Sequence, residues 1–317
     1  MPDAVKKNQK RHAERTGKLM SKIIVCDFGL ILHRCIFLYK MICIGEINRI
    51  LGLSKEEDLI AQDVLGMLDF NQEERLQAAY PDHFEQLKAI RRIPVTYNCL
   101  NMISGYMNQL KFNPKEDEVV LACDYGRSWR KKVDLSYKAQ RKENREAVMS
   151  GEWWKQKYDM FNDLIERMDK GLPFQVIKIW EIEADDIASY VCRHNPSKSI
   201  ICITTDEDWQ MLCQFPNVKI WSPVKKDYYD VKYPLKILAK KIDGDVSDNL
   251  LTKPQNEFEF ERRKQIVNLL ELPAWVDDVI KEVVDKQVPK NLQVQYLPFP
   301  SMQKKFLKIY GVLNGSD

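Results

Sequence analysis

The chain has 317 residues, enough for one large domain or two of ordinary size. Hydrophobic residues make up 44% of the chain and charged residues 30%, which excludes a protein that is disordered throughout. The formal net charge is only +3, but 49 basic and 46 acidic side chains contribute to it, so their placement matters more than their sum.

Residues 1–22 carry seven Lys or Arg side chains and two acidic ones. We expect a basic N-terminal arm that either contacts polyanions or only adds solubility. The apolar stretch 23–44 that follows is interrupted by charged residues such as Asp27 and Lys40, which argues against a transmembrane helix or a secretory signal. The eight cysteines form no Cys-x-x-Cys pair and favour free thiols in a reducing compartment. We therefore expect a soluble, intracellular protein.

Four short apolar runs recur along the chain, and a carboxylate follows each of them within a few residues. The runs are 23–26, 119–123, 174–180 and 200–204, and the acids are Asp27, Asp124, Glu183 and Asp206. Continuous apolar runs separated by helix-like segments predict buried parallel strands, hence an α/β fold with a central, mostly parallel sheet flanked by helices. Because the carboxyl ends of parallel strands share one edge, the four acids are expected in one crevice.

Helices are predicted on both sides of this pattern. Residues 44–95 are locally acidic and carry apolar residues at roughly helical spacing. After residue 250 the sequence predicts helices at 262–270, 274–284 and 301–310.

Three acidic motifs add to the strand-end carboxylates: Glu-Ala-Asp-Asp at 183–186, Thr-Asp-Glu-Asp at 205–208 and Gly-Asp-Val-Ser-Asp-Asn at 244–249. Each alone could be a helix first turn or a polar turn. Together, so many carboxylates would repel one another unless cations neutralise them, and an all-oxygen ligand set favours Mg²⁺ or Mn²⁺. Such ions suit two-metal hydrolysis of phosphodiesters. The candidate ligands are Asp27, Asp124, Glu183, Asp185, Asp186, Asp206, Asp208, Asp245 and Asp248.

A basic segment follows Asp124, with eight Lys or Arg side chains against three acids between residues 126 and 146. Trp129 and Tyr137 are interleaved with them. Such a surface can hold phosphates while aromatic rings stack on unpaired bases, although a solvated charged helix has the same composition. If the segment is helical, one face carries Lys131, Lys138, Arg141 and Arg145.

In this order the motifs resemble the 5′-nuclease (flap endonuclease) superfamily. The resemblance rests on Asp27 after a strand, on Asp124 followed by Arg130 and Tyr137-Lys138-x-x-Arg141, and on the three acidic motifs. It spans about residues 23–250. Ile24-Val-Cys-Asp-Phe, Trp129-Arg and Asn217-Val-Lys-x-Trp-Ser-Pro223 are most similar to the branch that holds the ribonuclease H, a 5′→3′ exonuclease, of T-even bacteriophages.

The resemblance implies a PIN-like 5′-nuclease fold with a basic arch and a smaller helical C-terminal region. The expected parts are a nuclease domain at 23–225, with a helical insertion at 44–95 and the arch at 126–155, and a C-terminal region at 226–317. That region departs from the family pattern, since Asp248-Asn is followed by Leu-Leu-Thr-Lys-Pro254 and not by Gly-x-Gly. The helix–three-turn–helix is therefore degenerate, and its potassium site is not implied. The insertion is either a docking surface for a replication partner or decoration.

The resemblance also implies an activity. It is that of a Mg²⁺-dependent 5′→3′ exonuclease and flap endonuclease with two ions, for which Mn²⁺ can substitute. The enzyme would remove RNA primers and adjoining DNA during lagging-strand replication, acting on DNA and RNA·DNA hybrids with flapped, nicked or 5′-ended duplexes. Expected partners are the phage single-strand binding protein and the replication machinery. A monomer without membrane contact is expected, in the cytoplasm of an infected bacterial host.

Individual roles follow from the same resemblance. Lys138, Arg141 and Arg130 would neutralise the scissile phosphate. One metal would be held by Asp27, Asp124, Asp185 and Asp206, the other by Asp208, Asp245 and Asp248, with Glu183 and Asp186 serving either. Further nucleic-acid contacts are expected at Arg127, Lys131, Lys132, Tyr137, Lys142 and Arg145.

Two other functions compete with this hypothesis. One is a catalytically silent relative that binds branched DNA, against which the presence of every motif acid argues. The other is a Mg²⁺ phosphohydrolase acting on small phosphates, for which the basic segment would be superfluous.

Overall fold

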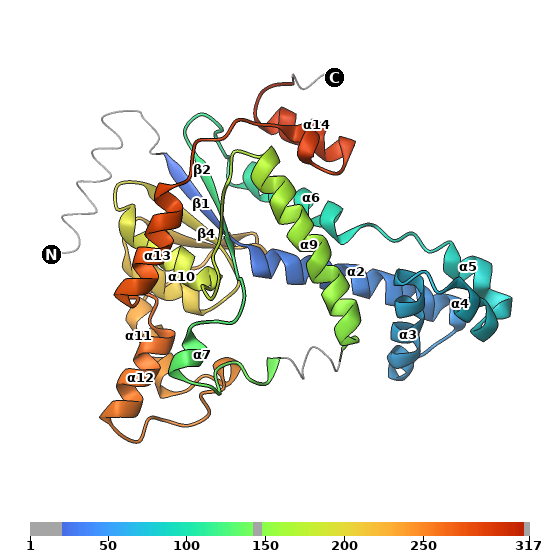
Figure 1. Ribbon diagram of the computed structural model, residues 1–317, viewed down its shortest axis with the longest axis horizontal. Helices are drawn as coiled ribbons and strands as arrows, with labels where there is room; N and C mark the ends of the chain where they lie inside the picture. Colours follow the sequence, from blue (N-terminus) through green and yellow to red (C-terminus); the bar gives the residue numbers. More distant parts are fainter. Residues whose placement is uncertain (1–20, 142–147, 314–317) are drawn as a thin grey trace. The chain divides into compact units, whose positions relative to one another are not determined.

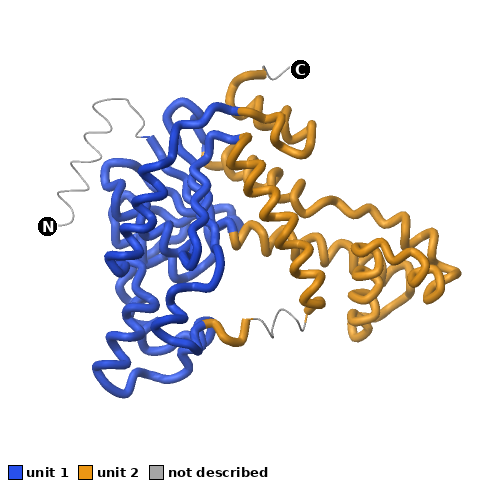
Figure 2. The backbone as a smooth tube through the Cα atoms, in the orientation of Figure 1, with its two compact units in different colours: residues 1–28, 111–137, 172–292 blue, residues 29–110, 138–171, 293–317 orange. Residues whose placement is uncertain are grey.

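The computed structural model describes residues 21–141 and 148–313. Two compact units, coloured separately in Figure 2, are each assembled from segments that lie far apart in the sequence. This differs from the linear division predicted above, because residues 226–292 belong with the sheet. Unit 1 comprises residues 1–28, 111–137 and 172–292, and unit 2 comprises residues 29–110, 138–171 and 293–317.

Unit 1 contains a six-stranded sheet in the order β3-β2-β1-β4-β5-β6. Figure 1 labels the central strands β2, β1 and β4. The first five strands in this order pair in parallel, and β6 is antiparallel to β5. The four predicted runs are β1 to β4, which confirms the α/β fold class; β5 and β6 were not predicted. The strands are β1 (Lys22–Asp27), β2 (Glu118–Cys123), β3 (Gln175–Lys178), β4 (Ser199–Ile203), β5 (Val218–Ser222) and β6 (Asp227–Tyr228).

The continuous apolar runs reflect burial on both faces of the strands. In β1, Ile23 to Cys26 are at most 2% exposed, so these four positions are all apolar and do not alternate with polar residues. The register then aligns the strand ends: Asp27 pairs with Ala122 of β2, and Cys26 pairs with Ile203 of β4. The acids that follow these strands therefore emerge at one edge of the sheet.

Helices α10 and α13 cover one face of this sheet. One apolar cluster joins Val25 and Ala122 of the strands to Ile187 of α10 and Val276 of α13. Helix α12 begins five residues before the predicted start because the side chain of Asn256 caps it, accepting a hydrogen bond from the Glu259 amide. The helical elements of unit 1 are α7 (Arg130–Val133), α10 (Ala184–His194), η3 (Asp208–Gln214), α11 (Pro234–Asp243), η4 (Val246–Asp248), α12 (Glu257–Val267) and α13 (Ala274–Asp285).

Unit 2 is helical in its described residues, as expected for residues 44–95 and 301–310. Helix α6 was not predicted. The elements are α2 (Phe28–Leu51), whose first residue lies in unit 1, η1 (Lys55–Glu57), α3 (Asp58–Asp69), α4 (Glu73–Ala79), η2 (Pro81–His83), α5 (Phe84–Lys88), α6 (Val95–Gln109), α9 (Gly151–Gly171), η5 (Val294–Tyr296) and α14 (Pro300–Ile309).

Helix α2 is the one described helix whose length and composition would allow it to cross a membrane, with a mean hydropathy of 1.6 over its most apolar window. Of that window, 44% is buried within the protein. Because the core helix of a globular protein passes the same test, this property alone does not indicate a membrane segment.

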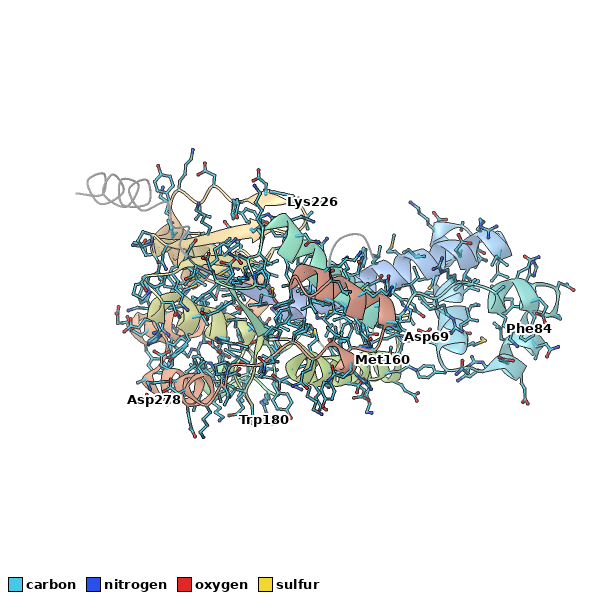
Figure 3. All side chains as sticks on the ribbon, turned by 90° about the horizontal axis from the view of Figure 1, so that it is seen from above. Asp69, Phe84, Met160, Trp180, Lys226 and Asp278 are labelled. Carbon is cyan, nitrogen blue, oxygen red and sulfur yellow. The ribbon has the colours of Figure 1, made fainter. Side chains whose placement is uncertain are left out.

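The acidic insertion is anchored to the rest of unit 2 by a buried carboxylate. Asp69, at the end of α3 and labelled in Figure 3, is 4% exposed at its side chain. It accepts hydrogen bonds from Trp153 Nε1 and Lys157 Nζ of α9, both at 2.8 Å, and from the hydroxyl of Tyr39 in α2. Residues 44–95 therefore contribute to the core of this unit. Deleting the part of the insertion that contains Asp69 would leave Lys157 buried without a carboxylate partner.

We predict that Asp69→Ala lowers the free energy of unfolding by about 3 kcal/mol, because the ammonium of Lys157 stays buried without a counter-charge. Chemical denaturation followed by circular dichroism measures this. The matched control is Asp63→Ala on the same helix, whose pair with Arg75 is exposed, with an expected loss below about 1 kcal/mol. Equal losses in the two variants would contradict the anchoring role.

Candidate metal centre

Three carboxylates from the second and third acidic motifs lie together in unit 1. Asp208 is the first residue of η3, Asp245 precedes η4 and Asp248 ends it. Their ligand oxygens all lie within 4.8 Å of one another, and no other trio of His, Cys, Asp or Glu in the described residues does so. Asp245 and Asp248 are 7% and 4% exposed. We call Asp208, Asp245 and Asp248 the triad; it is the set assigned above to the second ion.

A closed turn fixes two members of the triad. The backbone of Asp245 exchanges hydrogen bonds with Leu250, with N···O distances of 2.8 and 2.7 Å. Its side chain accepts from the amide and hydroxyl of Ser247 at 2.8 and 2.7 Å, and Asn249 adopts a left-handed conformation with φ of 64°. The motif is thus a polar turn that also presents acids, so the two interpretations offered for it are compatible.

Charge and burial shift the acidities within the triad. Burial and the neighbouring charge of Asp206 raise the pKa of Asp208 to about 7, although Lys241 opposes them. Burial also acts on Asp245, but hydrogen bonds from Lys241 and Ser247 outweigh it and hold its pKa below the ordinary value. Of these two acids, only Asp208 has its pKa raised by burial and by the repulsion between neighbouring carboxylates.

A chain of hydrogen bonds runs from the end of β1 to the triad. The hydroxyl of Thr204, which is fully buried, donates to Asp27 Oδ2 at 2.9 Å and accepts from the amide of Asp206 at 3.0 Å. Asp206 Oδ1 in turn accepts from the amide of Asp208 at 2.9 Å. Thr204 was not selected from the sequence; its position two residues before Asp206 at a strand end was the available signal.

The remaining strand-end acids are oriented by donors from neighbouring segments. Asp124 accepts from the amide of Ala184 at the start of α10, at 2.8 Å. Asp185 accepts from the indole Nε1 of the buried Trp209 at 2.6 Å, a contact that nothing in the sequence signalled. The structure orients the four carboxylates expected to hold the first ion but does not bring them to the ligand spacing of the triad; they are Asp27, Asp124, Asp185 and Asp206.

Arg130 occupies a buried polar network and not the sheet edge. Its side chain is 2% exposed, with Nη2 2.7 Å from Asp186 Oδ1 and Nη1 2.8 Å from Glu183 Oε2. Its Nε donates to the carbonyl of Ile266 at 2.6 Å, and Trp129 Nε1 donates to Asp186 at 3.0 Å. This geometry favours a structural role and argues against the predicted contact of Arg130 with phosphate and of Glu183 and Asp186 with metal.

The basic segment is not one continuous helix, so the prediction of a shared face is wrong over its described part. Helix α7 has only four residues and ends where Asp134 accepts hydrogen bonds from the amide and hydroxyl of Ser136, at 2.9 and 2.7 Å. Such local side-chain bonds compete with the helix. Tyr137 is buried, and its hydroxyl lies 3.1 Å from Glu183 Oε2, which does not suit base stacking.

The other predicted contacts of this segment are distributed as follows. Arg127 is exposed, Lys131 is half-buried and Lys132 forms an ion pair with Glu181. Lys138 and Arg141 belong to unit 2 and the acids to unit 1, so their predicted approach to the scissile phosphate stays a prediction. Three predicted elements lie wholly or partly outside the described residues: Lys142, Arg145 and the basic arm up to residue 20.

Comparison with known proteins gives this fold and site a family. Residues 77–241, more than half of the chain, match the family described as "5'-3' exonuclease, N-terminal resolvase-like domain". The protein belongs to this family. It is 30% identical over 171 residues to the protein named Ribonuclease H of Enterobacteria phage T4. That match covers 49% of this chain and 55% of the relative, so the chain spans about half the length of the curated relative.

Solved structures of a T5 protein share the fold. The T5 D15 protein co-crystallized with metal ions superposes with a TM-score of 0.52 at 14% identity, covering 91% of this chain and 99% of that chain. A variant of the bacteriophage T5 D15 flap endonuclease, in a pseudo-enzyme-product complex with DNA and metal ions, gives a TM-score of 0.52 at 14% identity. This match covers 92% of the present chain and 99% of the T5 chain. The α/β fold with a mostly parallel sheet is thus a known 5′-nuclease fold.

We predict that Arg130→Ala lowers the free energy of unfolding by about 3–5 kcal/mol, since Asp186 is left charged and fully buried. Thermal and denaturant unfolding measure the change. Arg127→Ala, at an exposed position in the same segment, should change stability by no more than about 0.5 kcal/mol. Unchanged stability with loss of nuclease activity in Arg130→Ala would restore the catalytic assignment.

The raised pKa of Asp208 predicts a pH dependence of stability in metal-free buffer. The folded protein binds more protons than the unfolded chain between pH of about 4, the ordinary value, and about 7, so stability should fall as pH rises through this window. Asp208→Asn should flatten the dependence, whereas Asp230→Asn, at an exposed site, should leave it unchanged. A wild-type stability that rises steadily from pH 4 to 7 and is copied by Asp208→Asn would refute the assignment.

Proposed function

We propose that this protein is a Mg²⁺-dependent 5′→3′ exonuclease and flap endonuclease. The observation that carries the proposal is the triad, three carboxylates whose oxygens lie within 4.8 Å at the acid-rich edge of a 5′-nuclease fold. Carboxylate oxygens suit Mg²⁺, with Mn²⁺ as a substitute, and not the softer transition metals. The solved T5 flap endonuclease was crystallized with DNA and metal ions, which supports the same substrate class here.

The triad fits one divalent ion, and the four acids expected for the other ion offer an all-oxygen ligand set whose spacing is wider than that of the triad. The triad would hold one ion, and the other would lie among Asp27, Asp124, Asp185 and Asp206. When bound, such a pair activates a water molecule and stabilises the leaving oxygen of an in-line displacement. The chain contributes the orientation of its ligands: Thr204 fixes Asp27, Trp209 fixes Asp185 and Ser247 fixes Asp245, each through hydrogen bonds of 2.6–2.9 Å. Donors of this kind keep the carboxylates aimed before the ions arrive.

The substrate and setting follow from the relatives. The phage T4 relative is named Ribonuclease H, which supports action on RNA·DNA hybrids. Removal of RNA primers and adjoining DNA during lagging-strand replication is part of the same proposal. Lys138 and Arg141 remain the proposed contacts to the scissile phosphate. Docking to a phage single-strand binding protein, a monomeric state and a location in the host cytoplasm belong to the same proposal.

The test is cleavage of a nicked, 5′-flapped duplex in Mg²⁺, with a labelled strand that resolves product lengths. Asp206→Asn should retain binding but lose cleavage by about a hundredfold or more, because a ligand to the first ion is neutralised. Asp230→Asn, at an exposed acid in the same unit, should cleave as the wild type does. Binding without cleavage by the wild type in both Mg²⁺ and Mn²⁺ would instead indicate a catalytically silent DNA-binding relative.

A further inference from the structure

A lysine side chain lies inside the triad. Lys241, in the last turn of α11, is 10% exposed at its side chain. Its Nζ forms an ion pair with Asp208 Oδ1 at 2.6 Å and donates a hydrogen bond to Asp245 Oδ2 at 2.7 Å. An i,i+4 relation to Asp245 across the end of the helix brings the two side chains together. The ammonium group thus bridges two of the three carboxylates proposed to hold the second ion.

The preceding residue shows that this placement is specific. Lys240 has the same chemistry, but its Nζ lies 2.9 Å from both carboxylate oxygens of Glu207, outside the triad, and its side chain is 63% exposed. Ion pairs of that kind are screened by solvent and contribute little. Adjacent positions on α11 therefore hold one solvated lysine and one enclosed lysine.

The oxygens that an ion would need from Asp245 are both engaged by the chain. Oδ1 accepts the amide and hydroxyl of Ser247, and Oδ2 accepts the ammonium of Lys241. Mg²⁺ requires oxygens at about 2.0–2.1 Å in a near-octahedral arrangement, which an ammonium hydrogen-bonded to the same atom obstructs. A monovalent and a divalent cation sharing oxygens also repel each other strongly within a buried site.

The net charge of the site also indicates that the ammonium of Lys241 weakens binding of a divalent cation. With all three carboxylates ionised, the ammonium leaves a net charge of −2 on the cluster, whereas the carboxylates alone would carry −3; protonation of one acid reduces the magnitude of both by the same amount. Removing the ammonium would free oxygens for coordination and would deepen the negative potential. Both effects favour binding of a divalent cation, so the expected direction does not depend on which is larger.

We propose that Lys241 is an internal competitor of the second divalent cation. Its ammonium holds Asp208 and Asp245 together while no ion is bound, and it has to leave them when an ion enters. Lys241 thereby sets the Mg²⁺ or Mn²⁺ concentration at which the triad fills. This inference rests on the proposed function, because it takes the triad as the second cation site.

Calorimetric titration of Mn²⁺ into the metal-free full-length protein tests the inference. Lys241→Met should bind the second Mn²⁺ at least about tenfold more tightly than the wild type, while Lys240→Met should match the wild type. In thermal unfolding, Lys241→Met should be less stable than the wild type without metal, and Mn²⁺ should raise its unfolding temperature by more than that of the wild type. Equal or weaker binding of the second ion by Lys241→Met would overturn the competition.

A second measurement covers the case in which Lys241→Met does not fold. In the wild type labelled with ¹⁵N-lysine, addition of Mg²⁺ should shift the side-chain ammonium resonance of Lys241 and raise its solvent exchange, with the Lys240 resonance unchanged as the reference. A Lys241 resonance that stays constant while Mg²⁺ binds would overturn the proposal. If Asp245→Asn leaves both the stoichiometry and the affinity of Mn²⁺ binding unaltered, the triad is not a cation site, and the two-ion form of the proposed function falls together with the competition. If two ions bind tightly and Lys241→Met has no effect on their affinity, the competition is refuted but the proposed two-ion function stands.

Discussion

Repulsion among carboxylates crowded at one edge of a sheet is the constraint on which the local structure of this protein depends. Four of the acids there are each matched by a donor: a hydroxyl for Asp27, a helix amide for Asp124, an indole for Asp185 and an ammonium for Asp245. The hydroxyl that meets Asp27 lies 177 residues away in sequence. Offsetting the repulsion therefore also joins distant segments of unit 1.

Neighbouring acids in one motif serve different purposes. In Glu-Ala-Asp-Asp, Asp185 accepts the indole of Trp209, whereas Asp186 points into the buried network of Arg130. Consecutive residues on a helix differ by about 100° in direction, so the first turn of α10 can present one carboxylate to the candidate site and another to the core. The motif thus links the chemistry of the sheet edge to the packing beneath it.

The sequence predicted the elements whose signal is local. Buried parallel strands leave apolar runs, and these runs gave β1 to β4 and the α/β class. The acidic motifs gave the members of the triad as candidate ligands, and the resemblance to the 5′-nuclease superfamily gave their grouping. The basic segment was misjudged because helical periodicity does not register that Asp134 bonds to Ser136, or that Arg130 faces Asp186. Lys241 was not selected because its role depends on a turn closed by Leu250. The interleaving of the two units depends on contacts distant in sequence, which no local pattern reports.

That interleaving has a consequence for how the chain folds as it is synthesised. Unit 2 is completed by residues 293–317, where the amide of Gln293 donates to the carbonyl of Gly171 at 2.8 Å and α14 packs on α6. The apolar residues of α2 therefore leave the ribosome long before their unit can close. Contacts so far apart in sequence are formed late, because the entropy cost of closing the intervening loop comes before the contacts stabilise the fold. We expect unit 2 to close only after residue 293 and those that follow it have been synthesised, with the early helices open to chaperones until then.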